Sequence, residues 1–146
     1  MNFFTTKNNN NNIKEHLSYC GYTIENTESG NMLCDKGYGP GMLVMCHENE
    51  ITLFGRYKLN QIAKNNLSDL LDYVNELNNS ALLITTLVNK KDGYIEFRAL
   101  YQGDYNKKSF SQFIKYWEND VIYNIDNHPN TDYFLGNGAI NNSIAA

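Results

Sequence analysis

The stretch from Ser68 to Tyr101 constrains the fold of this chain more than any other. Its first part, up to Asn78, carries apolar residues at the spacing of one helix face: Leu70, Leu71, Val74 and Leu77. Two apolar runs follow, and between them Gly93 suits the positive φ of a hairpin turn. The sequence therefore predicts a helix that leads directly into a two-stranded antiparallel hairpin.

The ends and the strands of this unit can also be assigned. Ser68 is the expected N-cap of the helix, and Asn78-Asn79 can end it because Asn tolerates the left-handed conformation. The run Ala81–Val88 is apolar on both sides, which is typical of a central strand. The run Tyr94–Tyr101 alternates, with Ile95, Phe97, Ala99 and Tyr101 inward and Glu96 and Arg98 outward.

Upstream of this unit, the pattern predicts one helix and several strands. Residues 1–8 are expected to be loose. A helix from about Asn9 places Ile13, Leu17 and Cys20 on one face, and Gly21 can stop it. Short extended segments are expected at Tyr22–Glu25 and Met32–Cys34, and a hairpin at Met42–His47 and Glu50–Lys58.

The strand Met42–His47 is apolar on both of its faces. An antiparallel sheet with helices on one side normally has one wet face, so we expect the second face of this strand to be covered by a chain segment or by a partner. The residues that we expect on this candidate partner or dimer surface are Leu43, Met45, Phe54, Tyr94 and Leu100.

Downstream of the unit, one more core helix is expected. Its apolar stripe is Phe110, Phe113, Ile114, Trp117 and Val121, with Ser109 as a possible cap. Pro129 ends any helical continuation, and Tyr133–Leu135 can dock back onto the body. The fold class is α+β: an antiparallel sheet with helices on one face, in the order α-β-β-β(-β)-α-β-β-α. The 146 residues form one domain, with a body at 9–128 and a C-terminal tail at 129–146.

Composition excludes several classes of function. The net charge of −4 argues against binding to nucleic acid or an anionic membrane, which requires clustered Lys and Arg. No apolar run approaches the ~20 residues that span a bilayer, and no signal-peptide pattern is present. The three cysteines, an odd number at irregular spacing, fit reduced thiols in the cytoplasm.

No set of residues assembles into a catalytic or metal site. Cys46 and His47 are neighbours on a strand, so their side chains point to opposite faces and cannot form a nucleophile–base pair. No CxxC or HxxxH unit is present for zinc. His16 and His128 are expected to be ordinary surface or boundary histidines. The glycines of Gly37–Gly41 lack the spacing of a phosphate-binding loop. We therefore expect no catalytic residue, no metal and no cofactor.

The order of elements resembles the bacterial YbjN-type domain, also called a sensory transduction regulator, whose fold is similar to that of class I type III secretion chaperones. The resemblance lies in four places: Leu17-x3-Gly21, the run Tyr73–Asn78, Gly93 with Tyr94–Leu100, and Phe110–Trp117. It covers roughly residues 9–125. The resemblance implies a small, usually dimeric, non-enzymatic protein that binds other proteins. The loop Gly37–Gly41 and the chain after Pro129 depart from the family pattern.

Three functional hypotheses remain open. The first is a cytoplasmic protein-binding module, chaperone-like or regulatory, that forms a homodimer. The second is an immunity protein that binds and neutralises a cognate bacterial toxin, a role that suits small acidic domains rich in Asn and Tyr. The third is a small hydrolase or ligand-binding enzyme, which would require a pocket lined by His16 or His47 together with carboxylates.

Overall fold

A computed structural model describes the backbone of residues 3–135 and the side chains from Asn10 onward. Its first helix, α1 (Phe3–Tyr19), is followed by four strands: β1 (Thr23–Asn26), β2 (Met32–Asp35), β3 (Met42–His47) and β4 (Glu50–Lys58). Two helices come next, α2 (Gln61–Asn65) and α3 (Leu67–Ser80), and then the hairpin of β5 (Thr85–Asn89) and β6 (Tyr94–Gln102). The described chain closes with α4 (Lys107–Glu118), the π-helix η1 (Asn119–Asn124), α5 (Ile125–Asn127) and α6 (Thr131–Leu135).

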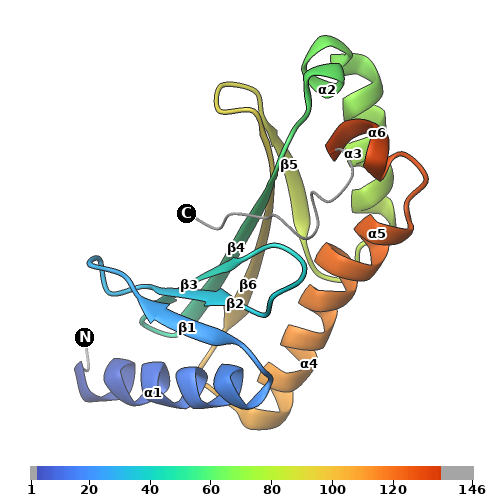
Figure 1. The fold of residues 1–146 in the computed structure, drawn as a ribbon. Coiled ribbons are helices and arrows are strands. Elements are labelled where there is room, and N and C mark those ends of the chain that lie inside the picture. The colour runs from blue at the N-terminus through green and yellow to red at the C-terminus, as the bar shows by residue number, and fades with distance from the viewer. Residues whose placement is uncertain (1–2, 136–146) are drawn as a thin grey trace.

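Within the described residues, all strands join one antiparallel sheet of six strands in the order β1-β2-β3-β4-β6-β5. The helices lie on one side of it: α1 runs beneath β1, β2 and β3, and α3 to α6 follow the other half of the sheet (Figure 1). The expected α+β class, with helices on one face, is confirmed. None of the helices in residues 3–135 has both the length and the apolar character needed to cross a membrane.

The core lies between the sheet and this helical layer. The expected stripe of α4 is confirmed, because Phe110, Phe113, Ile114 and Trp117 are all buried. Trp117 packs over Gly55 of β4 so closely that a Cβ at position 55 would lie 3.3 Å from the indole ring. The Tyr57 hydroxyl donates a hydrogen bond to the Val121 carbonyl at 3.2 Å. Gly55 therefore leaves room for the largest side chain of the core.

The C-terminal part of the described chain docks on α3. Phe134 is buried and its ring stacks on that of Tyr73 at 4.9 Å, while Tyr73 also shares a hydrogen bond of 2.8 Å with Thr131. The backbone N–H of Asn60 donates to the Phe134 carbonyl at 2.9 Å. The expected docking of Tyr133–Leu135 is thus observed in α6. The rest of the predicted tail, 136–146, lies outside the described residues.

The expectation of a central strand at Ala81–Val88 is wrong. β5 begins only at Thr85 and pairs with β6 alone, so it is an edge strand. A side chain of α3 supplies hydrogen bonds to the backbone groups on the unpaired edge of β5. Asn78 accepts from the Thr86 N–H at 2.8 Å and donates to the Thr86 carbonyl at 3.1 Å. An apolar run can serve an edge strand here because Asn78 occupies backbone groups that a further strand would use.

The residues before β5 form a loop that Asp120 holds. Asp120 of η1 is only 1% exposed, and its carboxylate accepts hydrogen bonds from the backbone N–H groups of Leu82, Leu83 and Ile84 at 2.9, 2.7 and 3.0 Å. These groups therefore bond to Asp120 and not to a neighbouring strand. This contact is the physical reason that the extended run is shorter than its apolar character suggests.

Two helix assignments also differ from expectation. α1 begins at Phe3 and not at about Asn9, so the segment expected to be loose is largely helical. α3 begins at Leu67 with Asn66 as its N-cap residue, which displaces Ser68 from that role, and it ends at Ser80. The buried face of α3 holds Tyr73 in place of Leu71, which is 47% exposed, because Tyr73 meets Phe134 of α6.

Candidate functional site

The sheet face opposite the helices carries a continuous set of apolar side chains. In the strand register, Leu33 of β2 lies opposite Leu43 of β3, and Leu43 lies opposite Phe54 of β4. Directly opposed residues of antiparallel strands point to the same face. Two residues further along the strands, Met45 of β3 lies opposite Thr52 of β4, and Thr52 lies opposite Leu100 of β6. We call this surface the open face; its residues are Glu25, Leu33, Asp35, Leu43, Met45, Thr52, Phe54, Arg56, Leu87, Tyr94, Glu96, Arg98 and Leu100.

The open face is partly accessible to solvent. Leu100 is 46% exposed and Leu87 is 40% exposed, whereas Leu43, Met45 and Phe54 are half-buried by their neighbours on the sheet. The described helices lie on the other side of the sheet (Figure 1). Contiguous apolar surface of this kind is characteristic of protein–protein contact sites.

Charged side chains lie among the apolar ones. The Arg56 guanidinium lies 4.0 Å from the centroid of the Tyr94 ring, and that of Arg98 lies 5.9 Å from the centroid of Phe54. Glu96 accepts a hydrogen bond from Asn89 at 2.8 Å and contacts Arg98 at 3.4 Å. Guanidinium groups held over aromatic rings combine apolar contact area with charge, a combination that is enriched at protein interfaces.

The structure brings all five sequence-predicted surface residues to this face. Leu43, Met45, Phe54 and Leu100 gather at its centre, and Tyr94 lies towards one end, opposite Lys58. Sequence reasoning missed Leu33 and Leu87 as members of the same surface. Their signal was the strand alternation itself, since Leu33 and Leu87 lie between residues that face the core.

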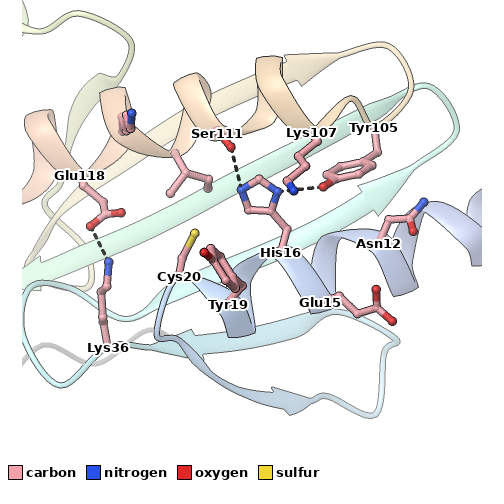
Figure 2. Close-up of a pocket in the computed structure, with 12 residues that line it drawn as sticks. Asn12, Glu15, His16, Tyr19, Cys20, Lys36, Tyr105, Lys107, Ser111 and Glu118 are labelled. Atoms are coloured by element: carbon pink, nitrogen blue, oxygen red, sulfur yellow. Dashed lines mark hydrogen bonds and ion pairs between the residues drawn. The ribbon is translucent and has the colours of Figure 1, made fainter.

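A second feature is a pocket of about 670 Å³ between α1 and α4 (Figure 2). His16 and Glu15 come from α1, Cys20 directly follows that helix, and α4 contributes Ser111 and Glu118. The remaining lining residues are Asn12, Tyr19, Lys36, Tyr105, Lys107, Ile114 and Lys115. The pocket thus contains the combination, a histidine with carboxylates, that the enzyme hypothesis requires.

His16 bonds on both sides of its ring. Its Nδ1 lies 2.8 Å from the Tyr105 hydroxyl and its Nε2 lies 3.2 Å from Ser111 Oγ (Figure 2). The ring also meets those of Tyr105 and Phe110 edge to face, at 5.8 and 5.0 Å. Burial, and to a lesser extent the Lys107 ammonium, lower the pKa of His16. The expectation of an ordinary boundary histidine therefore misses a residue that links α1 to α4.

The pair of Ser111 and His16 has only part of the geometry of a nucleophile and its base. The group that orients the imidazole is the Tyr105 hydroxyl, not a carboxylate, so an imidazolium formed here lacks a negative partner on Nδ1. Ser111 also lies within α4, where neighbouring N–H groups serve the helix and are not turned outward as oxyanion donors. The arrangement is better suited to joining the two helices.

The far end of the pocket is closed by an ion pair between Lys36 and Glu118 at 2.9 Å, with each side chain 17% exposed (Figure 2). Burial disfavours the charged form of Lys36, but the hydrogen bond and the charge of Glu118 outweigh it and raise the pKa of this lysine. The pair therefore holds the loop after β2 to the end of α4.

The three cysteines are free, and burial raises the pKa of each thiol. Burial raises the pKa of Cys34 to about 12 and that of Cys46 to about 11, and it also raises the pKa of Cys20. Cys46 lies beside the core residues, whereas His47 is exposed at the end of β3. In the part of the chain that the structure describes, no three His, Cys, Asp or Glu residues gather as a metal site would need.

These features define a small α+β domain in which an antiparallel sheet is packed against helices on one side and presents an apolar face on the other. The chain is similar in structure to YbjN from E. coli, a candidate transcription regulator known from a crystal structure, with a TM-score of 0.60 over 76% of this chain and 84% of that chain. The identity is 11%, so the likeness shows the fold. The expected YbjN-like fold is confirmed. No protein-family model matches the chain, and no curated protein matches its sequence.

Proposed function

We propose that this chain is a non-enzymatic regulatory or chaperone-like protein that binds other proteins through the open face of its sheet. The observation that carries the proposal is the row of Leu33, Leu43 and Phe54 across three adjacent strands, outside the helical layer. Contiguous apolar surface costs free energy when it is exposed to water, and such surface marks sites of contact with other proteins. The YbjN-like fold supports a regulatory role, since YbjN is itself described as a candidate transcription regulator.

The oligomeric state and the cellular location of the protein follow from the same features. We propose a homodimer, because the apolar residues of the open face span three adjacent strands and the described helices lie on the other side of the sheet. We also propose that the protein works in the cytoplasm, which agrees with three free thiols.

The test is affinity purification from the native host with two matched variants of the bait. Phe54→Asp places a charge at the centre of the open face, and Leu71→Asp places the same charge at an exposed leucine of α3, on the helical side. Any partner that co-elutes is then purified and titrated against each variant. We expect binding to wild type and to Leu71→Asp, and loss of binding with Phe54→Asp.

The identity of the partner separates the finer roles. A secreted effector assigns the chaperone role, a signalling or transcription protein assigns the regulatory role, and a toxin assigns the alternative role of an immunity protein. A purified partner that binds Phe54→Asp as tightly as wild type would refute the use of the open face.

The pocket at His16 supports a second candidate, a small-ligand or hydrolytic site. The specific observation is the contact of 3.2 Å between Ser111 Oγ and His16 Nε2 beside a cavity of about 670 Å³. A serine-directed phosphonate probe tests it directly, with Ser111→Ala as the control. Covalent labelling of Ser111 in the wild-type chain would establish a nucleophile and overturn the non-enzymatic proposal; we expect no labelling.

A further inference from the structure

The charges on the open face are arranged so that the face is complementary to itself. One row of the register crosses all six strands: Glu25, Leu33, Leu43, Phe54, Arg98 and Thr85, from β1 to β5. An acidic residue therefore lies two strands to one side of Leu43, and a basic residue lies two strands to the other side. Glu25 is exposed, and the Arg98 side chain is 57% exposed.

We propose that a second copy of this chain occupies the open face, related to the first by a two-fold axis that runs parallel to the strands over β3. This rotation exchanges β2 with β4 and β1 with β6, and it leaves positions along the strands unchanged. Leu43 then meets its own copy, Leu33 meets Phe54 of the other copy, and Glu25 meets Arg98 of the other copy. The inference rests on the proposed function, because it names the occupant of the same face.

A second charged pair agrees with the same axis. β2 and β4 run in the same direction, since each is antiparallel to β3. Asp35 lies two residues beyond Leu33 and Arg56 lies two residues beyond Phe54, so the rotation that pairs Leu33 with Phe54 also brings Asp35 opposite Arg56 of the other copy. A single axis thus matches two acids with two bases at the rim and apolar residues at the centre, the usual distribution in an interface.

Other two-fold arrangements fit the charges less well. An axis perpendicular to the strands places each residue of the row opposite its own copy, so Glu25 meets Glu25 and Arg98 meets Arg98. An axis between β3 and β4 places the Arg98 guanidinium opposite Leu33. Like charges that face each other, or a charge set against an apolar side chain, weaken an interface. Two sheets also pack face to face with their strands nearly aligned, as the axis over β3 requires.

The inference is tested by exchanging the two charges. We would measure the dimer dissociation constant by analytical ultracentrifugation over a range of concentrations, for wild type, Glu25→Arg, Arg98→Glu and the double variant. Each single variant places like charges at both ends of the row, so we expect its dissociation constant to rise by roughly tenfold or more. The double variant restores opposite charges, and we expect its dimer dissociation constant to be close to that of wild type.

Mixing the two single variants provides an independent readout. Native mass spectrometry of an equimolar mixture of Glu25→Arg and Arg98→Glu should show the mixed dimer in excess of both homodimers, because only the mixed pair has opposite charges at both ends. Asp72→Arg and Lys115→Glu, exposed on α3 and α4, are matched controls that we expect to leave the dissociation constant unchanged. Thermal unfolding of each variant verifies that its fold is intact.

Three results would overturn the inference. Wild type that remains monomeric at the highest soluble concentration excludes a second copy as the occupant. Single variants that dimerise as well as wild type exclude the axis over β3, as does a double variant that fails to recover. None of these results decides whether another protein uses the face, because the Phe54→Asp purification tests that separately.

Discussion

Leu43 and Phe54 lie directly opposite each other on β3 and β4, on the sheet face opposite to that of their buried strand neighbours Val44 and Leu53. Both are only half-buried in the single chain. A charge at Phe54 should therefore be tolerated by the fold, because the new carboxylate can reach water. At concentrations where the chain is monomeric, we expect Phe54→Asp to lower the free energy of unfolding by no more than about 1 kcal/mol. Leu53→Asp, at its fully buried neighbour, should prevent folding.

Urea unfolding followed by circular dichroism measures this difference. If Phe54→Asp unfolds the chain as severely as Leu53→Asp, then Phe54 is a core residue and the open face is not a free surface.

Asp120 provides a prediction about the loop before β5. In Asp120→Asn, one carboxylate oxygen becomes an amide that cannot accept from the N–H groups of Leu83 and Ile84, or of Leu82 if the amide is flipped. Buried N–H groups left without an acceptor cost about 1–3 kcal/mol each, so we expect a loss of roughly 3 kcal/mol in the free energy of unfolding.

The control for Asp120→Asn is Asn124→Ala, which leaves the three backbone bonds of Asp120 intact and removes a bond to the Ser80 carbonyl and a long contact of 3.5 Å with Asp120 Oδ1. We expect this variant to lose no more than about 1 kcal/mol. Equal losses of unfolding free energy for the two variants in urea titration would mean that the bonds from Asp120 to the loop contribute little to stability.

Alanine substitutions at two glycines of the loop between β2 and β3 should distinguish the cost of backbone strain from the cost of steric crowding. Gly37 and Gly39 both have positive φ, 86° and 74°, but a Cβ at Gly37 meets nothing within 4 Å, whereas one at Gly39 would lie 2.7 Å from Ile122 Cγ1. Gly37→Ala should cost about 1 kcal/mol from strain alone. Gly39→Ala should cost a further 1–3 kcal/mol, roughly, from overpacking.

The crowding at Gly39 can be relieved by a second change. In the Ile122→Ala background both clashing atoms, Cγ1 and Cδ1, are removed, so the extra cost of Gly39→Ala should fall while that of Gly37→Ala stays constant. Thermal melts of these variants check the coupling; a cost at Gly39 that does not depend on residue 122 would contradict the contact.

The lowered pKa of His16 predicts that the stability of the protein depends on pH. Its folded-state pKa is lowered, first by burial and then by Lys107, so the unfolded chain takes up a proton that the folded chain resists. The stability that His16 contributes is therefore complete above its ordinary pKa of 6.5 and is lost as the pH falls through the lower folded-state value. The groups facing its ring are Tyr105, Ser111 and Phe110, none of which carries a charge near neutral pH.

His16→Gln isolates this contribution, since Gln can still bond to a hydroxyl but does not titrate in this range. We expect the denaturation midpoint of wild type to fall relative to that of His16→Gln when the pH drops from above 6.5 to well below it. Parallel curves for the two proteins would show that His16 titrates alike in the folded and unfolded chain.

Much of the local structure could be predicted because it depends on side-chain periodicity. The alternation of Tyr94–Tyr101 and the stripe from Phe110 to Trp117 each place their apolar residues on one side of a regular backbone, whatever lies against them. The hairpin turn at Gly93 and the fold class follow from the same patterns. The five residues of the predicted partner surface reach one face for this reason as well, since strand alternation assigns each of them to a side.

The tertiary structure alone decided the order of the strands and the neighbours of each side chain. β5 looked central because its run is apolar. Asp120, far along the chain, binds the backbone that precedes β5 and shortens the strand, and β5 pairs with β6 alone. The bond of His16 to Ser111 joins residues separated by 95 positions. Periodicity assigns a residue to a face of its own element; which element it meets is a matter of long-range packing and buried hydrogen bonds, and no local pattern encodes those contacts.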